Sequence, residues 1–361
     1  MLAAKICLTG GPCGGKSTAL AKIERKLTDM GYKVLIINEV PTRIINSGIK
    51  PFGDDSINML DFEEIMLKEQ LTEEECYEKA AELINKKCVI LCDRGVFDIK
   101  SFINNEEFGY LLNKYNLSRL ELMDSYNLVI NLDTVAKGAE EFYTVENNAA
   151  RSEGIKDAVI RDDKCQEAWS PHSNFKVVDN STNFDEKIKR VIDIVKNYLG
   201  IEKRNSKKYL VSIKDNTMDI LNEKEISCVQ INQIYLSTDK ECEMRLRKRT
   251  LNNDSTYYIT VKKNNYGKER IITEEKIDKK TYERLLGQKE VINAVNKERI
   301  SFTYNDNVYK LDHFEDDTYI LEAPLNALIP PFIDLIKDVT LDDNYYNINI
   351  NSSCFTKIKK N

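Results

Sequence analysis

The sequence predicts two domains of different fold class. Residues 1–200 are expected to form an α/β domain with a doubly wound parallel sheet, and residues 208–345 an α+β domain built on an antiparallel β-barrel. Three observations support this. A chain of 361 residues exceeds what one core usually supports. Strands alternate with helices in the first half, whereas short strands follow one another in the second. A short charged linker, 201–207, separates the halves, and a tail, 346–361, follows.

The composition is that of a soluble globular protein, with 42% apolar and 31% charged residues. The longest apolar runs are too short to span a bilayer, and Met1 lies close to the first strand, so we expect neither a transmembrane segment nor a signal peptide. Nine cysteines without paired spacing indicate a reducing compartment, and we expect a cytoplasmic protein. The net charge of -6 argues against a nucleic-acid partner.

The strongest motif joins an apolar run, 6–9, to a helix-forming stretch, 18–26. The connection reads G-x-x-x-x-G-K-S, in which backbone N–H groups turn towards phosphate oxygens and the helix directs its positive end at the same anion. Lys16 can reach the β- and γ-phosphates, and Ser17 can ligate Mg²⁺. The flanking strand and helix favour a P-loop over a chance glycine-rich turn. The predicted nucleotide-binding residues are Gly10, Gly11, Pro12, Cys13, Gly14, Gly15, Lys16, Ser17 and Thr18.

A second apolar strand, 33–38, is followed by Glu39 and Arg43. Ligands of open α/β sheets bind beyond the carboxyl ends of the strands, so both side chains are expected to face the phosphates. Glu39 is a candidate general base or sugar ligand, and the alternatives are a helix cap or a surface carboxylate.

The third strand, 88–92, is almost wholly apolar and stops at Asp93 and Arg94. A buried parallel strand ends in this way at a functional edge. Asp93 is placed to hold Mg²⁺ or to accept a hydroxyl proton, and Arg94 to neutralise phosphate charge. An ordinary turn is the alternative.

Helices are predicted over 59–86 and 185–199, with a short strand over 176–178 between them. The apolar positions of the first helix assign it to packing and not to chemistry.

After a fourth strand, 127–132, the segment 149–163 carries Arg151, Lys156 and Arg161. P-loop kinases keep an arginine-bearing lid at this place, whereas a solvated helix face is the alternative.

Five motifs that recur in order identify a resemblance over most of residues 5–200: GGPCGGKST, NEVPTRIINSGIKP, CDRGVFD, AKGAEEFYTVENNAARSEG and AWSPH…DNSTNF. Together they resemble the TRPL translocation defect protein family, whose members join a P-loop domain to a CYTH-like barrel. The resemblance implies nucleotide binding, with GTP favoured, through residues 10–18. The broader relatives are P-loop nucleoside kinases, including the nicotinamide riboside kinase type.

The second half contains eight expected strands. Side chains alternate along a strand, so Arg245, Arg247 and Arg249 share one face. If this face of the strand points outwards, the three arginines are an ordinary solvated edge. Facing into a barrel, three guanidiniums need an anion such as a polyphosphate or a phospholipid head group. The strands are expected over 209–213, 231–236, 243–249, 257–263, 270–277, 300–304, 308–314 and 318–325, and a short apolar helix over 332–336.

The segments QIYL, MRLRKR, YYITVKK, KERI, KLDHF and ILEAPL resemble strands of the CYTH, or triphosphate tunnel, fold over about 205–326. This resemblance implies an acidic side at Asp312 and Glu322 and a basic lining at Arg245, Arg247, Lys262, Arg270, Lys297 and Arg299. Where the family has Glu-x-Glu-x-Lys, this chain reads RNSKK, and its closing strand reads Glu-Ala-Pro. Because hydrolysis of a triphosphate needs several carboxylates around a metal ion, the barrel is expected to bind anions and not to hydrolyse them.

Two functions follow, and a third, hydrolysis of tripolyphosphate in the barrel, is disfavoured by the missing glutamates. The first is a Mg²⁺-dependent GTP- or ATP-binding protein in which the nucleotide orders the segment around Arg151 and Arg161, and the barrel binds a phosphorylated small molecule or an acidic phospholipid head group. The second is a kinase of a nucleoside or related molecule, with Lys16 on the phosphates and Glu39 or Asp93 as base. Arg94, Arg151 and Arg161 would stabilise the negative charge that develops in the transition state of the kinase reaction. The chain shows no Asn-Lys-x-Asp signature of a guanine-specific switch protein.

Overall fold

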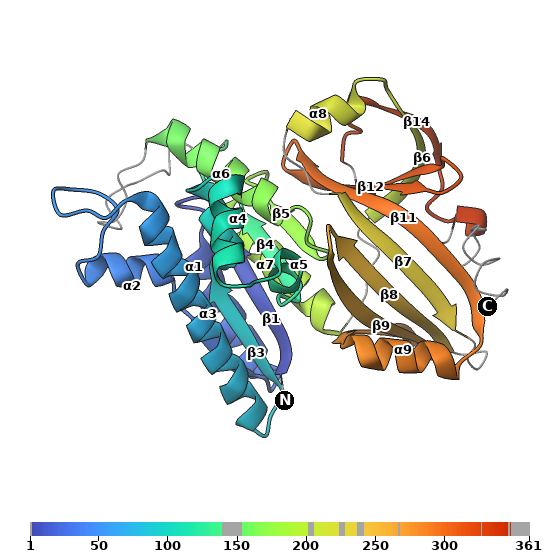
Figure 1. Ribbon diagram of the computed structural model, residues 1–361, viewed down its shortest axis with the longest axis horizontal. Coiled ribbons are helices and arrows are strands. Elements are labelled where there is room, and N and C mark those ends of the chain that lie inside the picture. Colours follow the sequence, from blue (N-terminus) through green and yellow to red (C-terminus); the bar gives the residue numbers. More distant parts are fainter. Residues whose placement is uncertain are drawn as a thin grey trace. The chain divides into compact units, whose positions relative to one another are not determined.

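The computed structural model describes residues 2–138, 154–200, 206–223, 228–236, 242–265, 268–325, 327–345 and 347. The chain divides into two compact units, Met1–Leu199 and Gly200–Asn361, which are drawn in Figure 1. Within the described ranges, no helix has both the length and the apolar composition that a membrane span requires.

The first unit contains a five-stranded parallel sheet in the order β2-β3-β1-β4-β5. Every residue of β3 and β4 is buried, as expected for a parallel sheet covered on both faces. The strands are β1 (Leu2–Thr9), β2 (Lys33–Ile37), β3 (Cys88–Asp93), β4 (Leu128–Leu132) and β5 (Phe175–Val178). The predicted parallel α/β fold is confirmed.

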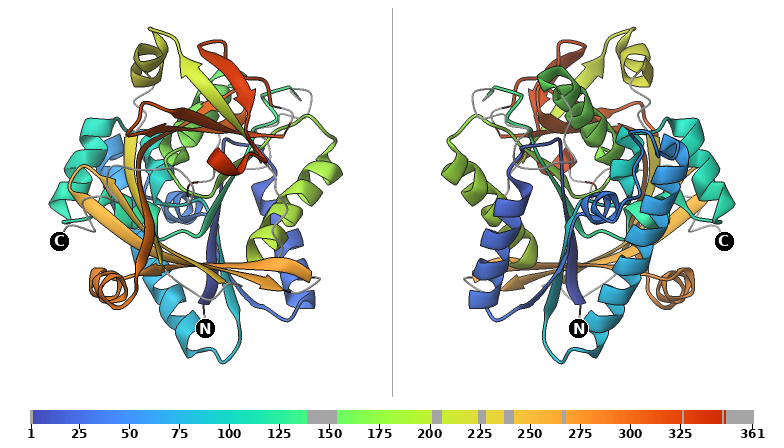
Figure 2. Two further views of the ribbon diagram at one scale, coloured as in Figure 1. Left: turned by 90° about the vertical axis from the view of Figure 1, so that its right-hand side faces the viewer. Right: turned by 90° about the vertical axis from the view of Figure 1, so that its left-hand side faces the viewer.

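Helices cover both faces of this sheet. Figure 2 shows α1 and α7 on one side and α3 and α4 on the other. Apolar residues of α1 and α7 pack in one core with the sheet, including Ile23, Leu27, Val191 and Val195. The helices are α1 (Lys16–Asp29), α2 (Val40–Asn46), α3 (Met59–Leu83), η1 (Val96–Ser101), α4 (Asn105–Lys114), α5 (Arg119–Met123), α6 (Ile155–Trp169) and α7 (Phe184–Gly200).

The second unit contains a nine-stranded antiparallel sheet in the order β10-β9-β8-β7-β11-β12-β13-β6-β14. Figure 1 shows that the sheet is strongly bent, in the manner of a barrel wall. Its strands are β6 (Ser206–Ile213), β7 (Cys228–Leu236), β8 (Cys242–Leu251), β9 (Asp254–Asn265), β10 (Lys268–Ile277), β11 (Val291–Tyr304), β12 (Asn307–Phe314), β13 (Tyr319–Pro324) and β14 (Ile333–Asp338). The helices are α8 (Thr217–Glu223), α9 (Lys279–Gln288) and η3 (Asp343–Tyr345).

All eight strands expected in this half are present, but the helix expected over 332–336 is wrong. That stretch lies in β14, which pairs with β6 through Ile333 and Ile213. A short apolar run is ambiguous between helix and strand, and pairing with an available edge strand decides it here. Strand β6 begins at Ser206, inside the range assigned to the linker.

Candidate functional site

The loop between β1 and α1 approaches the end of β4 so closely that glycine is required at two positions. A Cβ atom added to Gly10 or to Gly14 would lie 2.4 Å from the backbone oxygen of Leu132. Gly15 has a φ of +90°, and Cys13 a φ of +58°. These left-handed conformations turn the backbone into a concave loop that ends at the first turn of α1, the geometry in which N–H groups bind an anion.

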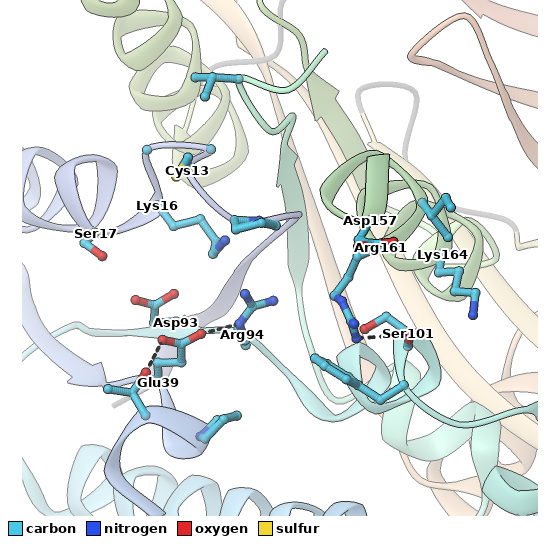
Figure 3. A pocket seen from close by; sticks show the side chains of 18 of the residues that line it. Cys13, Lys16, Ser17, Glu39, Asp93, Arg94, Ser101, Asp157, Arg161 and Lys164 are labelled. Carbon is cyan, nitrogen blue, oxygen red and sulfur yellow. Dashed lines mark hydrogen bonds and ion pairs between the residues drawn. The ribbon is translucent and has the colours of Figure 1, made fainter. Parts of the chain in front are cut away.

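Lys16 is buried, and its ammonium is held by its own loop. Its Nζ donates to the backbone oxygens of Gly10 and Gly11 at 2.9 and 2.8 Å. Burial lowers the pKa of Lys16, and the nearby charge of Arg94 lowers it further. Figure 3 shows this side chain extending from the loop into the pocket. The two carbonyl oxygens carry only partial negative charge, so a bound phosphate would be a stronger partner for the Lys16 ammonium.

Glu39 and Arg94 form an ion pair at the carboxyl ends of β2 and β3. The Nε atom of Arg94 lies 2.5 Å from Glu39 Oε1, and Thr42 donates to the other carboxylate oxygen at 2.6 Å. Burial acts to raise the pKa of Glu39, but Arg94 and Lys16 outweigh it and lower that pKa to about 2. Glu39 is therefore a fixed negative charge at neutral pH.

Asp93 is the buried carboxylate at the end of β3, with a relative exposure of 8%. Within the described ranges its Oδ1 atom has no hydrogen-bond partner. Burial raises the pKa of Asp93 despite the opposing charge of Lys16. Burying a carboxylate oxygen without a partner costs free energy. The position of Asp93 Oδ1 is therefore suited to coordinating a cation or to accepting a hydrogen bond from a bound molecule.

Ser17 and Asp93 fit the requirements of a Mg²⁺ site. Figure 3 shows both side chains around the same part of the pocket as Lys16. No cluster of three or more His, Cys, Asp or Glu side chains suited to a metal occurs among the described residues. Mg²⁺ at a nucleotide usually takes only one or two protein ligands and completes its octahedron with water and phosphate oxygens.

The phosphate loop opens into a pocket of about 1250 Å³. Beyond Glu39, Asp93 and Arg94, the pocket continues between α2, α3, η1 and α6. We call this part the apolar end of the pocket; its hydrophobic lining is Ile45, Phe52, Met59, Phe62, Phe102 and Ile160.

Glu63 also lines the apolar end, and it belongs to α3, the helix that the sequence assigned to packing. Burial raises the pKa of Glu63 to about 8, although Arg161 and Arg94 oppose the effect. A signal was present in the sequence. Glu63 and Glu74 stand at helical spacing from the apolar Leu67, and polar residues within a buried stripe are unusual.

Arg161 lies on α6 and lines the same pocket. Its guanidinium carbon is 3.9 Å from the centre of the Phe102 ring, and Nη1 lies 3.5 Å from the backbone oxygen of Ser101. Arg151 lies outside the described residues, so the lid remains a prediction.

Arg43 does not face the phosphate loop, contrary to expectation. Its exposed guanidinium pairs with Glu69 and Glu73 at 3.0 and 2.7 Å. Because α2 begins at Val40, the helical turn carries Arg43 away from the strand end and towards α3.

In the second unit, the arginines of β8 face inwards. Arg249 lies opposite Ile231 of β7, and Ile231 lies opposite Lys297 of β11, so all three side chains share one face of the sheet. Arg249 has a relative exposure of 3%, and Arg245 and Arg247 are largely buried. The three arginines therefore line the inside of the barrel wall and do not form a solvated edge.

Acidic side chains balance this basic face only in part. Glu274 pairs with Arg247 at 3.0 Å and with Arg245 at 3.5 Å. Within the described ranges, the Nε atoms of both arginines are buried without a hydrogen-bond partner. Burial acts to raise the pKa of Glu274, but the two arginines lower it to about 2. The excess of buried donors is suited to an anion.

A second cluster lies on the same face. Lys297 and Arg299 contact Asp312 at 2.7 and 2.6 Å, and burial lowers the pKa of Lys297 to about 7. Lys262 pairs with Glu243 at 3.0 Å, and Glu322 accepts a hydrogen bond from Ser206 at 3.1 Å. The side chain of Arg270 lies outside the described part of the chain.

Comparison with known families agrees with these two sites. A family model described as an AAA domain matches residues 5–187. The chain belongs to the AAA domain family. A second model, described as a CYTH domain, matches residues 207–327, so the AAA domain is followed by a CYTH domain. Both are nucleotide- or phosphate-binding domains in general terms. Among curated proteins, none is similar enough to the chain to count as a relative.

Three solved structures resemble part of the chain. The PH1819 protein of Pyrococcus horikoshii OT3 is 19% identical, with a TM-score of 0.27 over 34% of this chain and 78% of that one. A conserved hypothetical protein from Pyrococcus furiosus is 15% identical, with a TM-score of 0.26 over 35% and 80%. The PH1012 protein of Pyrococcus horikoshii OT3 is 19% identical, with a TM-score of 0.25 over 34% and 79%.

Proposed function

We propose that the AAA domain binds Mg²⁺ together with GTP or ATP, and that the CYTH domain binds a phosphate-rich ligand in a regulatory role. The observation that carries this proposal is the buried Oδ1 atom of Asp93 beside the phosphate loop, which has no hydrogen-bond partner in the described part of the chain. The resemblance to the TRPL translocation defect protein family supports a preference for GTP, and the unpaired spacing of the nine cysteines supports a cytoplasmic setting.

Different groups around the loop would bind different parts of the nucleotide. The backbone N–H groups of residues 10–18 would surround the phosphate oxygens, and Lys16 would exchange its two carbonyl partners for the β- and γ-phosphates. Ser17 and Asp93 would hold Mg²⁺, which neutralises phosphate charge when bound. Arg94 stays fixed on Glu39 and presents its remaining donors to the same anion.

The CYTH domain is proposed as a binding module. Its inward arginines supply the positive charge for a phosphorylated small molecule or an acidic phospholipid head group. Hydrolysis is disfavoured because Ala323 and Pro324 follow Glu322 where the family has a second glutamate.

Titration of ATP and GTP into the full chain by calorimetry, with Mg²⁺ and with EDTA, tests the AAA-domain proposal. We expect binding that depends on Mg²⁺, is lost in Lys16→Ala and is weakened roughly tenfold or more in Asp93→Asn. Lys22→Ala, which removes an exposed ion pair on the same helix, is the matched control and should bind as the wild type. Equal binding by Lys16→Ala and wild type would refute the proposal.

A kinase is the second candidate, and the apolar end of the pocket favours it, because a nucleotide held at the loop leaves this space for an acceptor. An acceptor hydroxyl oxygen would attack the γ-phosphorus and form a new P–O bond. The bond from that phosphorus to the bridging oxygen would break, the nucleoside diphosphate would leave, and the hydroxyl proton would pass to Asp93, whose pKa burial raises, or to Glu39. Arg94 and Arg161 would stabilise the transferring charge.

Phosphate release and nucleotide consumption separate the two candidates. Turnover that requires an added acceptor and disappears in Lys16→Ala would establish a kinase. Tight nucleotide binding with negligible turnover for every acceptor would leave a nucleotide-regulated binding protein.

A further inference from the structure

We propose that the apolar end of the AAA-domain pocket binds a second ligand, an uncharged ring-bearing small molecule, and that Glu63 determines its specificity by hydrogen bonding to it. This inference rests on the proposed nucleotide site and assigns the occupant of the adjoining space. Glu63 would contact the ligand directly, whereas the phosphate loop would contact only the nucleotide.

The first argument is the state of Glu63. Its relative exposure is 3%, and in the part of the chain that the structure describes it makes no hydrogen bond or ion pair. The carboxyl group lies on the pocket wall, so its remaining exposure is to the pocket. The Glu63 oxygens are not among the fully buried atoms that lack a partner in the described ranges, so they are reached from the pocket, where a ligand N–H or O–H group would bind them.

The second argument is the surface around Glu63. Phe52, Met59 and Ile160 are large hydrophobic residues with relative exposures of 46%, 38% and 53%, and all three line the apolar end. The guanidinium carbon of Arg161 lies 3.9 Å from the centre of the Phe102 ring. Such walls bury the faces of a planar ring and offer little to the phosphates of a nucleotide.

The third argument is charge. Glu63 lies on the α3 wall, and Asp157, Arg161 and Lys164 of α6 line the same pocket. Arg161, Arg94 and Asp98 act on Glu63 electrostatically. A cationic ligand would meet Arg161 and Lys164, and an anionic ligand would meet Asp157 and, above about pH 8, an ionised Glu63. An uncharged ligand that donates a hydrogen bond leaves this balance intact, and burial, which raises the pKa of Glu63 to about 8, makes the site sensitive to pH.

Calorimetry on the full chain, with Mg²⁺ and a non-hydrolysable ATP or GTP analogue present, tests the inference. The probes are adenosine, cytidine and pyridoxine, with nicotinamide riboside as a cationic and adenosine 5′-monophosphate as an anionic comparison. At pH 9, where the Glu63 carboxyl is ionised, we expect at least one uncharged probe to bind, to weaken roughly tenfold or more in Glu63→Gln, and to exceed both charged probes in affinity. Glu75→Gln, an exposed position on the same helix, is the matched control and should bind as the wild type.

The outcomes are distinguishable. Failure of the nucleotide analogue to bind would remove the proposed function together with this inference. Nucleotide binding without any uncharged probe, or a probe affinity unchanged in Glu63→Gln, would overturn this inference alone. A loss of nucleotide affinity in Glu63→Gln would also overturn it, because the apolar end would then hold the base of the nucleotide itself.

Discussion

The ion pair of Arg94 and Glu39 gives a prediction with a calculable size. Arg94→Met removes the guanidinium that lies 2.5 Å from Glu39 Oε1. The change leaves a largely buried carboxylate whose pKa burial would raise. Removing one partner of a buried pair strands the other charge, and the folded state loses the stabilisation of the ionised form.

The pKa of Glu39 supplies the magnitude. Its lowering from 4.5 to about 2 corresponds to about 3 kcal/mol in favour of the ionised carboxylate, shared among Arg94, Lys16 and Thr42. We therefore expect Arg94→Met to lower the free energy of unfolding by about 2 kcal/mol at pH 7. Because the pKa of Glu39 is lower in the folded chain than in the unfolded chain, this stabilisation is complete above pH 4.5. It is lost as the pH falls through the folded value of about 2.

Urea unfolding followed by tryptophan fluorescence measures this effect. The sole tryptophan, Trp169, is fully buried in the first unit and reports on the unfolding of that unit. The difference between wild type and Arg94→Met should be largest at pH 7 and should shrink by pH 3. Arg43→Met, which removes an exposed pair, should cost at most about 1 kcal/mol. A loss for Arg94→Met that matches the control, or that is the same at both pH values, would refute this reasoning.

Three further changes test other parts of the molecule. Gly14→Ala should abolish nucleotide binding in calorimetry, because the new Cβ would lie 2.4 Å from the backbone oxygen of Leu132. The control is Gly109→Ala in α4, where, among the described residues, no atom outside the backbone of its own helix lies within 4 Å of the added Cβ. This variant should bind nucleotide normally, and its free energy of unfolding in urea should rise by about 0.5–1 kcal/mol. Equal nucleotide binding by the two variants would contradict this. The affinity of the CYTH domain for tripolyphosphate should fall several-fold from pH 6 to pH 8, because burial lowers the pKa of Lys297 to about 7 and its proton is lost above that pH. Lys297→Arg should bind without this pH dependence. A wild-type affinity that does not change with pH would contradict the prediction. Asp162→Ala should lower the free energy of unfolding by about 1–2 kcal/mol and weaken nucleotide binding, because Asp162 Oδ1 accepts the loop N–H of Gly11 at 2.6 Å. Unchanged urea and nucleotide titrations would show that this contact does not position the loop.

Local chemistry made the nucleotide site of the first domain predictable. Gly10, Gly14 and Gly15 with Lys16 and Ser17 specify a turn and a set of donors within a few residues of chain, so the pattern is readable without knowledge of the rest of the fold. The ends of β2 and β3 were readable for a similar reason, since parallel strands end at one edge of a sheet. That edge also brings Glu39 and Arg94 into contact, an ion pair that the sequence did not predict.

Other features depended on partners that are distant in sequence. Periodicity placed Arg245, Arg247 and Arg249 on one face of a strand, but the direction of that face followed from the register of β7 with β8 and β11. The stretch over 332–336 became a strand because β6 offered an unpaired edge.

The sequence by itself determined the two fold classes, the phosphate loop and the presence of a basic stripe, because each is encoded in short-range spacing of residue types. The tertiary structure alone decided that Glu63 lines the pocket, that Arg43 turns away from it and that the stripe faces inwards. A helix or strand presents several faces, and the one that becomes buried is chosen by what packs against it, which local sequence does not specify.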